Sequence, residues 1–170
     1  MVRVDLRALA DGPIVTDVAV PPDAPLFEAL GIALDSPVHV WGRLTESGPG
    51  RYYWQGTLQS RLAGSCRRCL TRLSLAIEAN VHVLFAEEAA DDPSVYLIPS
   101  GSDELDLGPM VREELVLAAP AFALCREDCR GLCAQCGSDL NEGPCDCRPV
   151  PDPRWAALRA LQERESEDER

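Results

Sequence analysis

The chain contains no lysine, and its 16 basic residues, all arginine, are outnumbered by 28 acidic ones. The formal net charge is −12 at pH 7. A protein this acidic does not coat nucleic acid through bulk electrostatic attraction, because the phosphate groups would be repelled. Any contact with RNA therefore has to come from a local basic patch.

Long hydrophobic runs are also missing. The longest stretch without a polar or charged side chain covers residues 115–125, whereas a bilayer span needs about 18 apolar residues. The first residues, MVRVDLRALADG, are interspersed with charges and lack the apolar core of a secretory signal. We therefore expect no transmembrane helix, no membrane partner and a cytoplasmic location.

The sequence has little that suggests catalysis. It contains no G-x-S-x-G, no glycine-rich phosphate loop and no H-E-x-x-H motif. Its two histidines, His39 and His82, have no partner at catalytic or metal-binding spacing, and strand alternation places both on outer faces. The expectation is a protein that is not an enzyme.

Cysteine is the strongest signal that is present. Eight cysteines follow the order C-x2-C, a gap of 55 residues, and then C-x3-C-x3-C-x2-C-x8-C-x-C. In a chain without a secretory signal, such residues are metal ligands or redox thiols more often than disulfides. Eight thiolates suffice for two tetrahedral structural zinc sites. The predicted ligands are Cys66, Cys69, Cys125, Cys129, Cys133, Cys136, Cys145 and Cys147.

Loop length favours one division of these ligands. A compact C-terminal site closes the shortest loops, which chain entropy favours, and it consists of Cys133, Cys136, Cys145 and Cys147. Gly137 lets backbone N–H groups turn back onto the sulfurs of this site. The second site would then contain Cys66, Cys69, Cys125 and Cys129. The alternative is a zinc ribbon, in which the two C-x2-C pairs face each other.

Hydrophobic periodicity predicts an antiparallel sheet. Apolar and polar residues alternate over 73–85, 38–44 and 52–62, and a turn-rich SGPG segment occupies 47–50. Three consecutive antiparallel strands are the simplest topology for these segments. Residues 2–6 and 14–20 suggest two more strands, and residues 93–98 a sixth.

Helical signals are weaker in the first half of the chain and clearer after residue 100. A short helix is expected after the candidate cap Asp23. Asp106 can cap a second helix that has Pro109 in its first turn and stops before Pro120. A third is expected over 153–165, with Asp152 as its cap.

The predicted fold class is α+β, with an antiparallel sheet or partly open barrel of about five or six strands, helices, and a C-terminal cysteine-rich segment. Residues 1–100 form the mainly antiparallel β domain that carries the first C-x2-C. Residues 101–170 supply a helix, the zinc knuckle and the terminal helix, packed with the first part as one unit.

One segment of the chain is locally basic. No acidic residue occurs between Glu46 and Glu78, and five arginines lie in that interval. They either offset the negative charge of a four-thiolate zinc site or contact phosphate groups. Tyr52 and Trp54 are expected in the core of the sheet, whereas Tyr53 points the other way and can stack on a base. The candidate RNA contacts are Arg61, Arg67, Arg68, Arg72 and Tyr53.

The sequence resembles a known bacterial family. Four segments carry the resemblance: SCRRCL, DLGPMVREELVLAAP, LCREDCRGLCAQCGSDLNEGPCDC and DPRWAALRAL. They are similar to the corresponding segments of the YceD family of large ribosomal RNA subunit accumulation proteins. The similarity spans roughly residues 35–163. One departure is Ala134, where the family more usually has proline, and it leaves the candidate ligands unchanged.

The resemblance implies a function. It implies a cytoplasmic, non-catalytic factor needed for the synthesis, processing or stability of large-subunit (23S) ribosomal RNA. The implied partners are precursor RNA, an assembling large-subunit particle, or a basic ribosomal protein that meets the acidic surfaces. The alternative function is a redox-responsive zinc–thiol regulatory protein, in which oxidation of the thiolates releases zinc.

Overall fold

The computed structural model describes residues 2–88, 92, 94–147 and 153–155. The chain forms two compact units, Met1–Glu127 and Asp128–Arg170. The division expected near residue 100 stays a prediction. Of the helix expected over 153–165, the described residues include only a 3₁₀ turn at Pro153–Trp155, and the rest lies outside them.

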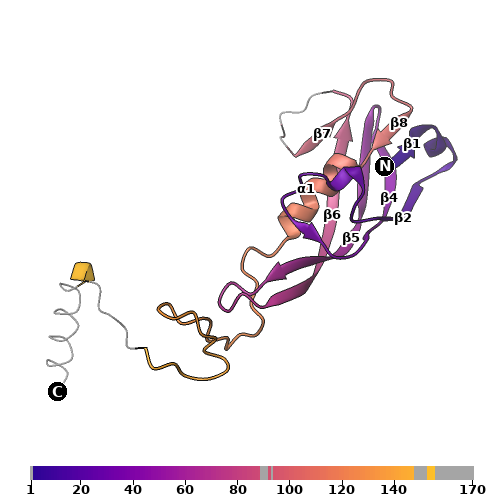
Figure 1. The fold of residues 1–170 in the computed structure, drawn as a ribbon. Coiled ribbons are helices and arrows are strands. Elements are labelled where there is room, and N and C mark those ends of the chain that lie inside the picture. Colours follow the sequence, from indigo (N-terminus) through magenta and orange to yellow (C-terminus); the bar gives the residue numbers. More distant parts are fainter. Residues whose placement is uncertain (1, 89–91, 93, 148–152, 156–170) are drawn as a thin grey trace, which may run out of the picture. The chain divides into compact units, whose positions relative to one another are not determined.

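The first unit is built on a six-stranded sheet (Figure 1). Five strands follow one another across it in the order β2 (Ile14–Val20), β4 (Val38–Gly48), β5 (Arg51–Ser65), β6 (Arg72–Ala86) and β7 (Val95–Leu97). The short β3 (Ala33–Leu34) pairs with β5 at one end. The α+β fold class with about six strands is confirmed.

The central strands are consecutive and antiparallel, as the alternation predicts. β4 and β5 are joined by a tight turn between Gly48 and Arg51, and β5 pairs with β6 from Arg51 opposite Ala86 to Ser65 opposite Arg72. This long hairpin places the SCRRCL turn at its far end.

Two strands pair in ways that the sequence pattern does not predict. β7 runs parallel to β6, with Val95 opposite Leu84, so this edge departs from the antiparallel expectation. β1 (Arg3–Asp5), the strand expected near the start, pairs with β8 (Glu104–Asp106) in a separate two-stranded sheet. Strands of three residues are too short for a hydrophobic period to determine either direction or partner. A 3₁₀ helix, η1 (Leu6–Asp11), follows β1.

Helix α1 (Gly108–Ala118) packs against β6 and β5. The Asp106 side chain accepts a hydrogen bond from the Gly108 N–H at 2.8 Å, so it caps the helix although Leu107 occupies the N-cap position. The helix ends before Pro120, as expected. Within the described residues, no helix is long and apolar enough to cross a membrane.

The short helix expected after Asp23 is a 3₁₀ turn, η2 (Pro25–Phe27). Its N-cap is Ala24, which makes no side-chain cap, so the assignment of Asp23 as cap is wrong. Proline at the first helical position has a preset φ and no N–H to satisfy, which reduces the need for a capping side chain.

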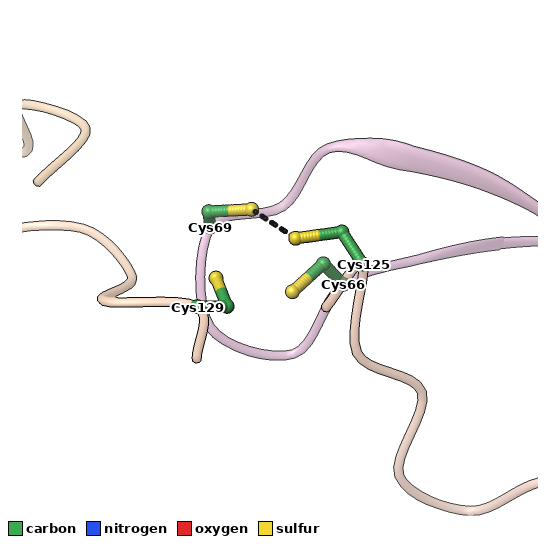
Figure 2. A group of neighbouring side chains, drawn as sticks. All are labelled: Cys66, Cys69, Cys125 and Cys129. Carbon is green, nitrogen blue, oxygen red and sulfur yellow. Dashed lines mark hydrogen bonds between the residues drawn. The ribbon is translucent and has the colours of Figure 1, made fainter. Parts of the chain in front are cut away.

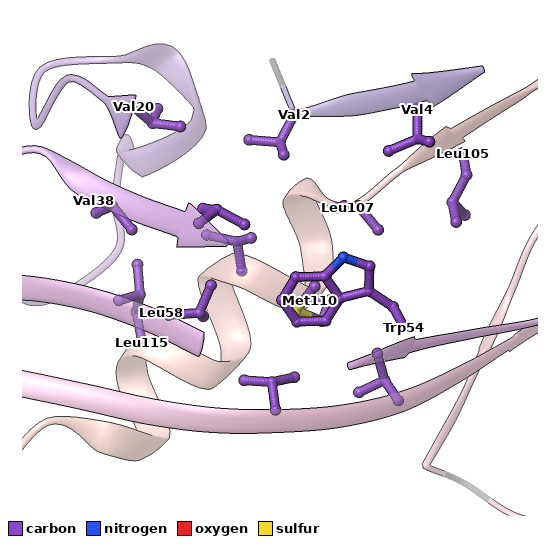
Figure 3. Close-up of a cluster of buried hydrophobic side chains, with 14 of the residues drawn as sticks. Val2, Val4, Val20, Val38, Trp54, Leu58, Leu105, Leu107, Met110 and Leu115 are labelled. Carbon is purple, nitrogen blue, oxygen red and sulfur yellow. The ribbon is translucent and has the colours of Figure 1, made fainter. Parts of the chain in front are cut away.

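Trp54 lies at the centre of the core and is fully buried, as Figure 3 shows together with Leu107 and Met110. Two facing glycines, Gly42 on β4 and Gly56 on β5, make room for its indole. A Cβ atom at Gly42 would lie 2.4 Å from Trp54 Cζ2. The inward direction of Trp54 and the outward direction of Tyr53 agree with the alternation.

Candidate metal centres

The first group of cysteines gathers at the end of the β5–β6 hairpin. Cys66 and Cys69 lie in the turn between the strands, and Cys125 and Cys129 lie in the segment that follows α1. Figure 2 shows the four sulfurs pointing toward a common centre. All four Sγ atoms lie within 4.8 Å of one another. Three of these cysteines are buried, and Cys125 is exposed.

The second group forms within the C-terminal unit. It consists of Cys133, Cys136, Cys145 and Cys147, whose Sγ atoms also lie within 4.8 Å of one another. A miniature hairpin supports it, because Leu132 bridges Asp139 and the Cys133 N–H donates to the Ser138 carbonyl at 2.9 Å. These are the two groups that loop length favours. The zinc-ribbon pairing of the two C-x2-C motifs is therefore wrong.

The two C-x2-C turns share one backbone geometry. In each, the residue two positions after the first cysteine points its N–H at that sulfur at 3.4 Å: Arg68 at Cys66, and Gln135 at Cys133. In each, the N–H four positions after the first cysteine donates to the carbonyl of that cysteine at 2.9 Å, from Leu70 and from Gly137. The chain thus builds the same knuckle twice.

This knuckle needs a left-handed residue immediately after its second cysteine. Gly137 fills that position with φ of 74°, and glycine adopts this conformation without steric cost. In the first knuckle the position is Leu70, with φ of 62°. A leucine in this region carries backbone strain. The surrounding structure therefore imposes on Leu70 a backbone conformation that leucine disfavours.

Hydrogen bonds to sulfur favour the thiolate form of cysteines in each group, including Cys66 in the first and Cys136 in the second. Backbone N–H groups, that of Cys69 foremost, lower the pKa of the Cys66 thiol to about 6. The Ser138 side chain and then its N–H lower the pKa of the Cys136 thiol to about 6. Hydrogen bonding with Cys136, followed by desolvation, raises the pKa of Cys147 to about 12. A bound cation would displace the proton that Cys147 retains, because metals bind the thiolate form.

The donor set fits zinc. Four sulfurs around Zn²⁺ at about 2.3 Å stand about 3.8 Å apart at the edges of a tetrahedron. Cys69 and Cys125 place their Sγ atoms 3.6 Å apart. Both groups can therefore hold a metal ion in the closed, four-coordinate arrangement typical of structural sites.

Supporting polar groups complete these sites, and sequence analysis missed them. The hydroxyls of Thr71 and Ser138 lie 3.2 Å from the sulfurs of Cys69 and Cys136, respectively. Asn141 donates from Nδ2 to Cys129 Sγ at 3.5 Å and accepts from the Arg130 N–H at 2.8 Å. The repeat C-x2-C-x-[ST], present in both CRRCLT and CAQCGS, is the signal that identifies the two hydroxyls.

The structure brings three of the predicted basic residues to the metal end of the hairpin. Arg67 and Arg68 lie between Cys66 and Cys69, and Arg72 begins β6. The Arg67 guanidinium lies 4.2 Å from the centroid of the Phe122 ring, and Arg68 donates to the Glu127 carbonyl at 3.2 Å. Both side chains thus contact the segment that follows α1 and carries Cys125 and Cys129.

The other two candidates lie farther along β5. Arg61 donates from Nε to the Ser74 hydroxyl at 3.0 Å. Tyr53 lies near the opposite end of the strand, eight residues or about 26 Å from Arg61. Its hydroxyl hydrogen-bonds His82 Nδ1 at 2.9 Å, and the two rings stack. The structure therefore does not gather Tyr53 with the arginines.

The sheet, the hairpin knuckle and the second knuckle together define a small α+β protein with two four-cysteine centres. A family model described as "Large ribosomal RNA subunit accumulation protein YceD" matches residues 54–162, a range that includes all eight cysteines. This chain belongs to the YceD family.

Three relatives are similar to this chain in sequence. A protein of Mycobacterium tuberculosis named as uncharacterized is 31% identical over 109 residues, which cover 61% of this chain and 52% of the relative. The Arabidopsis thaliana protein named large ribosomal RNA subunit accumulation protein YCED homolog 1, chloroplastic, is 23% identical over 145 residues, 67% of this chain and 45% of the relative. Bacillus subtilis YlbN, also named as uncharacterized, is 29% identical over 139 residues, 78% of each chain.

The chain spans about half the length of the mycobacterial and Arabidopsis relatives. No solved structure matches it.

Proposed function

We propose that this chain is a non-catalytic factor that supports synthesis, processing or stability of large-subunit (23S) ribosomal RNA and ribosome assembly, with a fold stabilised by two structural zinc ions. The family match across both cysteine groups carries the proposal. The description of that family and the name of the Arabidopsis relative both refer to accumulation of this RNA.

Zinc acts structurally in this proposal. Each predicted ion takes four thiolates, which leaves no coordination position for a substrate or an activated water. The C-terminal segment has almost no apolar core, since Arg130 to Cys147 contributes no fully buried large hydrophobic residue among the described residues. Metal ligation supplies the folding free energy that such a segment lacks.

The metal end of the hairpin is the proposed place of RNA contact. Arg67, Arg68 and Arg72 are exposed and lie within one turn of the chain. Arginine forks pair well with phosphate oxygens. The surrounding acidic surface would limit binding to this patch and could also meet a basic ribosomal protein. We place the protein in the cytoplasm, where ribosomes assemble.

The proposal is tested by replacing the chromosomal gene with one encoding the Arg67→Glu, Arg68→Glu double variant. Mature large-subunit RNA is then measured relative to small-subunit RNA. We expect the ratio to fall, and zinc content and melting temperature are measured on the purified variant to separate loss of RNA contact from damage to the adjacent metal centre. The matched control is Arg7→Glu, an exposed arginine elsewhere in the first unit, which should leave the ratio normal. A normal ratio both in the double variant and in a strain lacking the gene would overturn the proposed function.

The second candidate function is a redox-responsive zinc–thiol regulator. The exposed Cys125 sulfur lies 3.6 Å from Cys69, close enough for two thiolates to be joined after a small movement. Peroxide would accept two electrons from the pair, yielding a disulfide and two hydroxides and releasing the ion. Loss of one zinc per chain at mild peroxide concentrations, reversed by a thiol reductant, would support this function. Unchanged zinc content would eliminate it.

A further inference from the structure

The surface of the main sheet opposite its core has a distinctive composition. We call it the outer face, and its central residues are Val15, Asp17, His39, Trp41, Arg43, Tyr53, Gln55, Thr57, Gln59, Arg61, Glu78, Asn80 and His82. They alternate along their strands with buried residues such as Val40 and Leu58. The sheet register orders them in rows, and one row contains Asp17, Trp41, Thr57 and Asn80 side by side.

Trp41 is 61% exposed although β4 is an interior strand of the sheet. It borders a groove of about 450 Å³ on the outer face, lined also by Arg43, Gln55, Thr57 and His82. Large side chains at the middle of a sheet normally lie in the core, as Trp54 does. The exposed indole therefore leaves its aromatic face open to a ligand in the groove.

Polar groups in the groove are available to a ligand. Within the described part of the chain, the side chains of Arg43 and Gln55 have no hydrogen-bond or ion-pair partner. This contrasts with Gln59, which donates to Glu78 at 3.1 Å one row away. Thr57 donates to Asn80 Oδ1 at 3.2 Å, which orients the Asn80 amide and leaves its N–H groups directed elsewhere. The groove thus offers donors and acceptors around an aromatic plane.

The charge of the outer face differs from that of the chain. The outward positions of β2, β4, β5 and β6 carry four arginines, Arg43, Arg51, Arg61 and Arg72, against two acids, Asp17 and Glu78. The whole chain has a net charge of −12. A net positive face on an acidic protein is complementary to a polyanion, whereas the acidic surfaces of the same protein repel one.

We propose that the outer face binds an unpaired segment of RNA, with one base stacked on the Trp41 indole. The Gln55 and Asn80 amides face the hydrogen-bonding edge of that base, and Arg43 pairs with a neighbouring phosphate. Asp17, beside Trp41, accepts a hydrogen bond from an exocyclic amino group. Sheet aromatics and amides read single-stranded RNA in this manner because unpaired bases expose both a π face and a polar edge. This inference rests on the proposed function and names the form of RNA that it involves.

A protein partner fits the same surface less well. The only large apolar side chains in the groove are Trp41 and Val15, and the other lining residues described are polar or glycine. A protein interface of stable size has an apolar centre that excludes water. The polar lining and the positive charge favour RNA.

The test uses the full zinc-loaded chain and a fluorescein-labelled 12-nucleotide single-stranded RNA of mixed sequence, with the same strand in a duplex for comparison. Binding is followed by fluorescence anisotropy. We expect Trp41→Ala to weaken single-strand binding about tenfold or more and Trp41→Phe to retain most of it, since one stacked base is lost only in the first. The matched control is Val116→Ala, because Val116 is 44% exposed on α1 and lies beside Leu30 and Pro109, off the outer face. Unchanged melting temperatures would show that all variants fold.

Equal affinity of Trp41→Ala and wild type for the single strand would overturn the inference. It would also be overturned if duplex and single strand bound equally, or if Trp41→Ala only abolished self-association in sedimentation, which would make the face a protein interface. Cellular RNA levels separate this failure from that of the proposed function. If loss of the gene lowers large-subunit RNA while Trp41→Ala binds RNA normally, the function stands and the outer-face site does not.

Discussion

The Sγ atoms of Cys69 and Cys125 lie 3.6 Å apart, although 56 positions separate them in the sequence. The distance exceeds the 2.05 Å of a disulfide by far and is close to the edge of about 3.8 Å in a tetrahedral zinc–thiolate site. A metal ion here would tie the tip of the β5–β6 hairpin to the chain that leaves α1. It would thereby reinforce the contacts that already join these two segments, such as the hydrogen bond from the Arg67 N–H to the Ala123 carbonyl at 2.9 Å.

Metal content should follow the division into two groups. We expect two zinc ions per chain in the wild type, and one in both Cys66→Ser and Cys133→Ser, measured by mass spectrometry of metal on purified protein. The double variant should bind none. Structural zinc contributes about 10 to 16 kcal/mol of apparent binding free energy in small peptides, so each loss should also lower stability strongly. Unchanged stoichiometry in both single variants would show that the ligands are misassigned.

Replacing Leu70 with glycine should stabilise the folded protein. Its φ of 62° costs about 1 kcal/mol for a residue with a Cβ atom, and its side chain is 62% exposed, so little packing is lost. We expect Leu70→Gly to raise the free energy of unfolding by about 0.5 to 1 kcal/mol in urea titration, after allowing for the flexibility of glycine in the unfolded chain. Leu70→Ala is the control, because alanine keeps the Cβ atom and the strain. A loss of stability in both variants would mean that the leucine side chain makes a needed contact, and a loss in the glycine variant alone would contradict the assignment of strain to Leu70.

Gly42 should tolerate no side chain. An alanine Cβ there would lie 2.4 Å from Trp54 Cζ2 and 2.7 Å from the Gln55 carbonyl oxygen. Displacing a buried indole costs about 1 to 3 kcal/mol, so thermal melting of Gly42→Ala should occur several degrees below that of the wild type. Gly64→Ala provides the comparison, because its Cβ would meet only the flexible end of Leu75 at 3.1 Å. Equal melting temperatures of the two variants would contradict this view of the core.

The Asn141 side chain should raise the zinc affinity of the first metal centre. Its Nδ2 donates to the Cys129 sulfur at 3.5 Å. Asn141→Asp would replace that donor by a carboxylate, which repels a thiolate, and we expect the zinc affinity of this centre to fall about 10- to 100-fold in chelator competition. Asn80→Asp, which is on the outer face of the sheet, should leave zinc affinity unchanged. If both variants retain wild-type affinity, Asn141 only shapes its loop.

Much of the first unit follows from local pattern. The alternation over 73–85 and 52–62 predicts the long hairpin, because a one-residue slip would move every buried side chain to the solvent face. The pairing of β1 with β8 does not follow, since it joins Val4 to Leu105 across most of the first unit and three-residue strands contain too little pattern. The parallel direction of β7 was missed for the same reason.

The candidate sites were predictable to different degrees. Loop length favours the correct division of the cysteines because thiols are few and their spacing constrains them, but the zinc-ribbon alternative was excluded only by the positions of the sulfurs. The strained Leu70 was not predictable from its residue type, which disfavours the conformation it adopts. Alternation places Trp41 on the outer side of β4, opposite the side on which Gly42 and Gly56 face the core. The groove beside Trp41 was not predicted, because it depends on the register of neighbouring strands.

Direct contact with large-subunit RNA is tested most directly by ultraviolet crosslinking in growing cells, followed by sequencing of the attached RNA and mapping of the attached peptide. We expect crosslinks from residues 41–72 to precursor large-subunit RNA, with Trp41 and the segment around Arg67 among the modified positions. Absence of such crosslinks, in cells whose large-subunit RNA still depends on the protein, would contradict direct binding. It would leave a basic ribosomal protein as the partner of the acidic surfaces.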